Sequence, residues 1–117
     1  MSNSLIPIDL TKSPREQVLP LHNRWYPAIP PVVTVQPGSV FRVEYYDWAG
    51  GQIANHDSAN DIRDVELPQV HYLSGPIAVE GAEPGDILVV DILNIGALVM
   101  SPWGCSGISR ESSSLGW

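Results

Sequence analysis

The sequence predicts a mainly β protein with little helix, built as a sandwich or a barrel-like sheet. Eleven prolines and ten glycines in 117 residues leave few windows long enough for a helical repeat. Short runs of β-branched and aromatic residues lie between these breakers, and Pro-Gly pairs precede two of the runs. Pro followed by Gly suits the central positions of a type II turn, so the pattern favours strands joined by tight turns.

Two strands are predicted directly after the Pro-Gly pairs. Apolar and polar residues alternate over Val40–Tyr46, which is typical of a half-buried strand. The run Asp86–Ile95 is almost continuously apolar, which is typical of a strand covered on both faces. Shorter strands are expected near Val32–Val35 and Ile77–Glu80.

The remaining segments are predicted to be loops. Ser58–Leu67 is expected to form at most a short helical turn, capped by Ser58 or Asn60. Leu21–Pro31 is rich in proline but also carries His, Arg, Trp and Tyr, so an ordered loop packed on the sheet is expected rather than a linker. The serine-rich ending SRESSSLGW has no periodicity, and disorder is its expected state.

Composition narrows the classes of partner. Six Lys and Arg stand against thirteen Asp and Glu, giving a net charge of −7 and a pI near 4.6. The basic residues are scattered, which argues against nucleic acid and anionic membrane as partners. The single cysteine, Cys105, fits a reducing compartment. With neither a secretory signal nor an apolar stretch of about 18 residues, the chain is expected to be cytoplasmic.

The segment from Asp47 to Asp86 is the most polar part of the chain. It holds five aspartates, three glutamates and two of the three histidines. Enclosing such groups is costly unless they pair, bind a metal or face water. The segment is therefore either a solvated acidic loop or half of a reaction site, and loop composition alone favours the solvated loop.

Several blocks together resemble the formamidase/acetamidase family. The blocks are HNRW at 22–25, GGQI at 50–53, HYLSGPI at 71–77 and VEGAEPGD at 79–86. The resemblance runs from about Leu19 to Ile108, and HYLSGP makes it closer to the formamidase branch. It implies hydrolysis of small linear amides to the carboxylic acid and ammonia, in a β-rich, homo-oligomeric protein that in several members contains a metal.

The resemblance also implies an organisation for the chain. Residues 1–18 are expected to be an amino-terminal extension, residues 19–108 a partial family β domain, and residues 109–117 a divergent tail. Members of the family are much longer, so this chain is expected to be incomplete and to show little activity alone. The alternative is a non-catalytic β module whose acidic loop binds a partner or a cation.

Amide hydrolysis needs an activated water or nucleophile, a group that stabilises the oxyanion and a proton donor for the amine. With the resemblance, His71 and Asp57 are the candidate catalytic residues, and His22 and Gln52 the candidate substrate-binding residues. A divalent metal such as zinc is expected to take His22, Asp47 and Asp57 as ligands, since histidine and carboxylate suit it.

Ordinary structural roles compete with these assignments. His22 equally suits a histidine that is hydrogen-bonded to its own loop, and Asp47 suits the cap of the Gly-Gly turn that follows it. Asp57, Asp61 and Asp64 would share one face of a helical turn, which marks either a cation site or a wet surface. His56 stands where the formamidase pattern has an acidic residue, and it is left out of the site.

Overall fold

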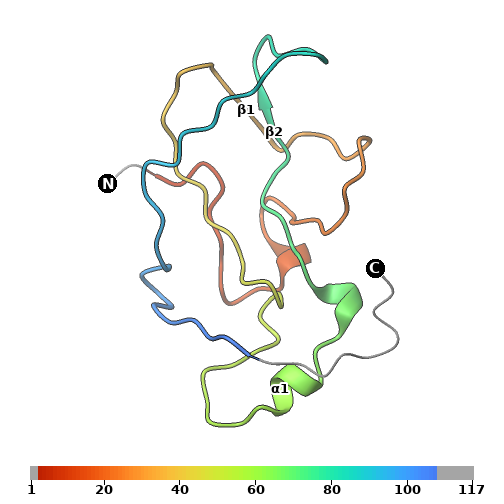
Figure 1. Cartoon of the computed structure of the whole chain (residues 1–117), viewed down its shortest axis with the longest axis vertical. Helices are drawn as coiled ribbons and strands as arrows, with labels where there is room; N and C mark the ends of the chain where they lie inside the picture. The colour runs from red at the N-terminus through yellow and green to blue at the C-terminus, as the bar shows by residue number, and fades with distance from the viewer. Residues whose placement is uncertain (1–2, 108–117) are drawn as a thin grey trace.

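The computed structural model describes residues 3–107, and its regular elements are few and short. Strands β1 (Val33–Val35) and β2 (Ile77–Val79) form a two-stranded parallel sheet in which Val33 faces Ile77. The helical pieces are α1 (Asn60–Arg63) and two 3-10 turns, η1 (Pro14–Glu16) and η2 (Leu67–Gln69). Figure 1 shows that extended loops make up most of the chain between these elements.

Two isolated bridges extend the β pairing. Ile6 pairs in parallel with Val43, and His22 pairs antiparallel with Leu73. Around the first bridge, the Leu5 amide donates to the Arg42 carbonyl at 2.8 Å and the Glu44 amide donates to the Ile6 carbonyl at 3.0 Å. The segment predicted as an amino-terminal extension therefore hydrogen-bonds to residues 42–44.

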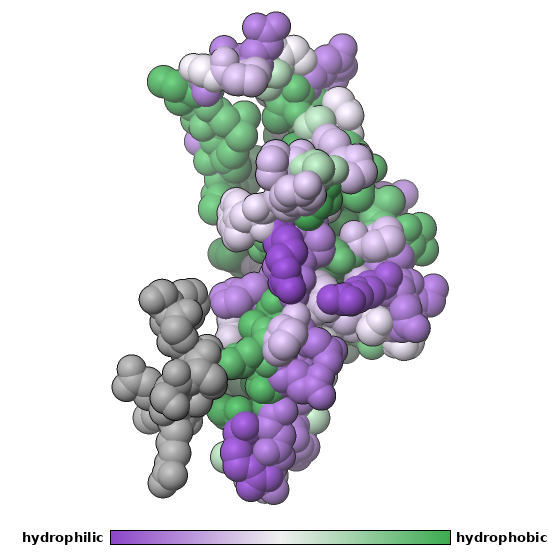
Figure 2. Space-filling view, turned by 90° about the vertical axis from the view of Figure 1, so that its right-hand side faces the viewer, coloured by the Kyte–Doolittle hydropathy of each residue, from purple (hydrophilic) through white to green (hydrophobic). Residues whose placement is uncertain are grey.

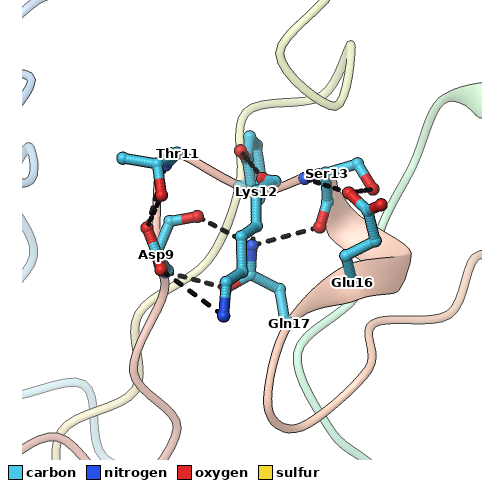
Figure 3. Close-up of polar contacts among 7 residues, drawn as sticks. Asp9, Thr11, Lys12, Ser13, Glu16 and Gln17 are labelled. Carbon is cyan, nitrogen blue, oxygen red and sulfur yellow. Dashed lines mark hydrogen bonds and ion pairs between the residues drawn. The ribbon is translucent and has the colours of Figure 1, made fainter.

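A buried glutamine organises the loop that follows. The amide nitrogen of Gln17 donates to the carbonyls of Asp9, Lys12 and Ser13, and its oxygen accepts from the Asp9 amide at 2.7 Å (Figure 3). Gln17 is only 4% exposed, so these bonds satisfy a polar group that burial would otherwise penalise. Glu16 closes the turn by accepting from the Ser13 amide and hydroxyl.

The hydrophobic core is small. Among the described residues, the buried hydrophobic side chains are Ile6, Leu21, Ala49, Val70 and Tyr72, and Pro14 of η1 is buried as well. They come from segments far apart in the sequence, so the core joins the amino-terminal part, the Gly-Gly turn and the stretch before β2. The Tyr72 hydroxyl, at the edge of this core, accepts a hydrogen bond from the Arg15 guanidinium at 3.0 Å.

Two of the four predicted strands are wrong as secondary structure. Val40–Tyr46 contributes one bridge, at Val43, and Asp86–Ile95 contributes no strand. In Figure 1 the second segment is the cyan trace that runs from the top of the molecule toward its left side. Both segments have strand-like sequences, but a strand forms only where a second strand pairs with it. Within residues 3–107, Val40–Tyr46 pairs only at the single bridge to Ile6, and Asp86–Ile95 pairs with no other segment.

The unpaired segments leave apolar surface in contact with water. Ile87, Val89 and Ile92 are 91%, 78% and 77% exposed. The accessible surface is 9595 Å², compared with roughly 6200 Å² for a compact monomer of this mass. Figure 2 shows hydrophobic groups reaching the surface at several places on one face. This part of the chain is open where a sandwich or barrel would be closed.

The fold class is otherwise confirmed, because helix is scarce and the long-range pairings are of the β kind. A closed sandwich or barrel does not form within the described residues. The predicted strands near Val32–Val35 and Ile77–Glu80 are confirmed as β1 and β2. The expectation of disorder for residues 109–117 lies outside the described residues. No helix within residues 3–107 has the length and apolarity needed to cross a membrane.

Candidate functional site

Three loops that carry the candidate residues converge on the stretch before β2. The Asn23 side-chain amide donates to the carbonyls of Pro68 and Val70, at 2.8 and 3.1 Å. The His71 backbone amide donates to the Trp48 carbonyl at 2.9 Å. Residues 21–24, 47–52 and 66–73 are therefore held together by direct hydrogen bonds, although they are far apart in the sequence.

His71 is fixed by Trp48. The indole Nε1 donates to the imidazole Nε2 at 2.8 Å, and the two rings meet edge to face with centroids 5.4 Å apart. His71 has a φ of 62°, the left-handed region that few residues other than glycine adopt. Such backbone strain persists only where neighbouring contacts enforce it, and it is often found at functional sites.

Asp47 forms a turn with the glycines that follow it. Its two carboxylate oxygens accept from the backbone amides of Ala49 and Gly51, at 2.9 and 2.8 Å. Gly50 and Gly51 have φ values of 66° and 85°. A Cβ on Gly50 would lie 3.0 Å from the Gln69 carbonyl oxygen and from the Tyr72 ring, so the turn is packed closely against the η2 segment. The Asp47 side chain therefore caps the Gly-Gly turn.

Gln52 joins two of the converging loops. Its side-chain oxygen accepts from the Glu66 amide at 2.8 Å, and its nitrogen donates to the Ala49 carbonyl at 2.9 Å. Longer contacts of 3.4 Å reach the carbonyls of Glu66 and Gln69. Both ends of the amide therefore bond to backbone groups.

His22 lies beside the same stretch through its backbone. Its carbonyl accepts from the Leu73 amide at 2.7 Å, and its own amide donates to the Leu73 carbonyl at 3.4 Å. Its side-chain Nδ1 is 2.9 Å from the Arg24 carbonyl, an acceptor, so Nδ1 carries a proton and the neutral ring keeps its lone pair at Nε2.

Asp57 lies in a shallow hollow of the loop that leads into α1. The other residues lining that hollow are His56, Ser58, Asn60 and Asp61. Asp57 is exposed, and its carboxylate makes no hydrogen bond or ion pair within residues 3–107. Hydrogen bonds bring together the loops that carry His22, Asp47, Gln52 and His71, and within residues 3–107 no hydrogen bond or ion pair of the Asp57 carboxylate reaches them.

The expected acidic face of a helical turn is not formed, because each carboxylate has its own surroundings. Asp61 accepts from His56 Nε2 at 2.8 Å and from the Ala54 amide at 2.9 Å. Asp64 pairs with the neighbouring Arg63 guanidinium, and the hydrogen bond from Arg63 holds the pKa of Asp64 below its ordinary value. His56, left out of the predicted site, is a structural partner of Asp61.

The three predicted metal ligands do not fit one metal. Both oxygens of Asp47 accept from backbone amides, Nδ1 of His22 faces a carbonyl, and Asp57 belongs to a separate hollow. Across the described stretch of chain, no three His, Cys, Asp or Glu side chains are grouped so that they could hold a metal ion. A zinc ion shared by His22, Asp47 and Asp57 is therefore not supported by this geometry.

Trp48 is the residue that sequence reasoning missed. A signal was present, since an indole N–H that is partly enclosed usually finds an acceptor and Trp48 directly precedes the Gly-Gly turn. Trp48 and Asp47 also line a large open hollow that is bordered mainly by residues 35–49 and 77–98. His71 does not line that hollow, so Trp48 lies between His71 and the hollow.

Comparison with known proteins agrees with the arrangement of blocks. The chain belongs to the Acetamidase/Formamidase family, whose model matches residues 7–117. It is 55% identical over 114 residues to a formamidase of Methylophilus methylotrophus and 54% identical over 115 residues to an acetamidase of Mycolicibacterium smegmatis. These nearly equal identities do not separate the formamidase branch from the acetamidase branch.

A solved structure shares the fold of this part. The gamma lactamase from Delftia acidovorans superposes with a TM-score of 0.79 at 57% sequence identity, over 83% of this chain and 24% of that chain. The matches to these two curated relatives include 97% and 92% of this chain. The chain spans only 28% of the length of each relative. The family match includes residues 7–18 and 109–117, beyond the limits of the resemblance found from the sequence.

Proposed function

We propose that this chain forms part of an amidohydrolase that cleaves the carbon-nitrogen bond of small linear amides, giving a carboxylate and ammonia. The proposal rests on family membership and on relatives named formamidase and acetamidase at 55% and 54% identity. The structural observation that supports it best is the strained His71, which is fixed by Trp48 where three loops converge.

Each residue of the proposed site has a role that its contacts permit. His71 is the catalytic group, because it is exposed and its Nδ1 makes no hydrogen bond to any of residues 3–107. His22 is the substrate-binding group, with Nε2 as an acceptor suited to an amide N–H. Gln52 acts by shaping the loop rather than by direct contact, since backbone groups occupy its amide.

Asp57 keeps a catalytic role only as a proposal. An exposed carboxylate without a protein partner is chemically able to move a proton, but nothing in the contacts ties it to His71. No step is assigned to a metal, because the expected ligands do not gather. A cytoplasmic location and a homo-oligomeric assembly complete the proposal.

A chimera tests the function directly. The Methylophilus methylotrophus formamidase would have its matching segment, 28% of its length, replaced by this chain, and ammonia release from formamide and acetamide would be measured. We expect hydrolysis in the chimera and little in the isolated chain. In the chimera, His71→Asn should lower kcat by about 100-fold or more, since Asn tolerates positive φ but lacks the imidazole.

The control is His56→Asn, which alters a histidine whose contacts are structural. A folded chimera without ammonia release would favour the non-catalytic β module instead. That alternative draws on the exposed loop 54–61, and calorimetry with divalent cations on the isolated chain would test it.

A further inference from the structure

We propose that Trp48 is a positioning residue that holds His71 in one tautomer, with the proton on Nδ1. His71 would then act as a hydrogen-bond donor to the amide carbonyl oxygen and not as the base. The donor role of His71 rests on the proposed function, whereas the tautomer of His71 is independent of it.

The tautomer follows from which atom donates. An indole nitrogen can only donate, so His71 Nε2, 2.8 Å from Trp48 Nε1, must present a lone pair. A neutral imidazole with its lone pair at Nε2 carries its proton at Nδ1. The edge-to-face contact, with an interplanar angle of 89°, limits rotation of the ring away from this bond.

The backbone fixes the direction of the ring as well. The His71 amide donates to the Trp48 carbonyl at 2.9 Å, so the two residues are joined through both backbone and side chain. The residues on either side, Val70 and Tyr72, are 7% and 8% exposed and belong to the core. The exposed imidazole is therefore carried on a rigid support, with its N–H on the side away from Trp48.

This arrangement suits one catalytic task better than another. Attack on an amide places negative charge on the carbonyl oxygen, and an N–H donor that is already in position stabilises that charge. A base needs an available lone pair, and the lone pair of Nε2 already accepts from Trp48. Neutral histidine serves as such a donor in other enzymes. The group that activates the water must then be another residue.

The first experiment measures the tautomer in the isolated chain. Long-range nitrogen-proton NMR on protein labelled with ¹⁵N-histidine, in mildly alkaline buffer, distinguishes protonation at Nδ1 from protonation at Nε2. We expect His71 to be protonated at Nδ1. Trp48→Phe keeps an aromatic ring but removes the donor, and it should give a mixture of both tautomers.

Trp25→Phe is the matched control, because Trp25 is 94% exposed and should not alter His71. A His71 that is protonated at Nε2, or already a mixture with Trp48 intact, would overturn the inference. This result needs no variant and no activity, so failure of a variant to fold leaves the test in place.

The second experiment measures catalysis in the formamidase chimera. Trp48→Phe should lower kcat by about tenfold or more with little change in KM, since the donor acts on charge that develops in the transition state. A Trp48→Phe chimera with unchanged kcat would overturn the positioning role. A chimera without activity whose His71 is protonated at Nδ1 would refute the proposed function and leave the tautomer established.

Discussion

His22 and Leu73 hydrogen-bond to each other in both directions across the candidate site, with N–O distances of 2.7 and 3.4 Å. The pair joins HNRW and HYLSGPI, two of the four sequence blocks that together carry the resemblance. The position of His22 beside Leu73 therefore depends on a backbone pairing, and the side chain at residue 22 can be changed without breaking that pairing.

The Gly-Gly turn offers a test of close packing. Gly50→Ala should lower the free energy of unfolding by about 1–3 kcal/mol more than Gly38→Ala does, because its Cβ would meet the Gln69 carbonyl and the Tyr72 ring at 3.0 Å. Gly38 also has positive φ, 78°, but has nothing within 4 Å, so it isolates the backbone effect. Urea denaturation of both variants gives the difference, and equal values would contradict the packing.

Gln52 separates a structural role from direct substrate contact. Gln52→Ala should destabilise the chain by about 1–2 kcal/mol, because the Glu66 amide and the Ala49 carbonyl lose their partner. The denaturation midpoint should therefore fall. An unchanged midpoint in the chain, together with a raised KM in the chimera, would instead support direct binding of the amide.

Substitutions of the two aspartates in loop 54–61 should differ in their effects on stability and on activity. Asp61→Asn should loosen residues 54–61 by about 1 kcal/mol, since Asp61 accepts from His56 and from the Ala54 amide. Asp57→Asn should leave stability unchanged. If Asp57 is catalytic, its variant in the chimera loses about 100-fold in ammonia release. Full activity in that variant would assign Asp57 to the solvated surface.

Acid should loosen the amino-terminal loop. The hydrogen bond from the Thr11 hydroxyl, followed by that from the Thr11 amide, lowers the pKa of Asp9 below its ordinary value of 3.8. A depressed folded-state pKa stabilises the loop above pH 3.8, and this stabilisation is lost as the pH falls through the lower, folded-state value. NMR titration of the Asp9 carboxyl should show the shift.

Thr11→Val is the matched variant for this titration. It removes the hydroxyl and keeps the backbone amide, so the pKa of Asp9 should return part of the way to its ordinary value. Ser13→Ala should act in the same direction on Glu16, whose pKa is lowered by the Ser13 hydroxyl and amide. A titration of Asp9 that Thr11→Val leaves unchanged would count against this hydrogen bond.

The unpaired apolar segment should make the isolated chain self-associate. Replacing Ile87 and Val89 by serine should weaken association by about tenfold or more, because both side chains are largely exposed and available for burial between copies. Val18→Ser is the control, since Val18 is 83% exposed but lies elsewhere in the chain. Sedimentation velocity at several concentrations would decide, and a strictly monomeric starting chain would contradict the prediction.

Local sequence patterns correctly predicted the two strands that pair with each other within the chain. The runs around Val33–Val35 and Ile77–Val79 were predicted and do pair, because each meets the other within the chain. Asp86–Ile95 has a strong strand pattern, but it pairs with none of residues 3–107. Its apolar pattern reports a preference for burial, but a strand also needs a second strand beside it.

The site was predicted in part for a similar reason. Turn chemistry correctly offered capping as the alternative for Asp47, because Asp followed by glycines is a local pattern. The convergence of the His22, Gln52 and His71 loops depended on family resemblance, since their hydrogen bonds cross long stretches of sequence. The Trp48–His71 bond depends on ring orientation, which the spacing of residues does not reveal.

The parallel pairing of β1 with β2 has a consequence for biosynthesis. Val33 finds its partner at Ile77, and the bridge from His22 waits for Leu73. Until residues 68–80 have been synthesised, the long-range hydrogen bonds of residues 3–39 reach only residues 42–46. Contacts of such large sequence separation form slowly. Before those residues emerge, strand-like segments of the nascent chain are exposed, and chaperones that hold extended apolar segments should recognise them during translation.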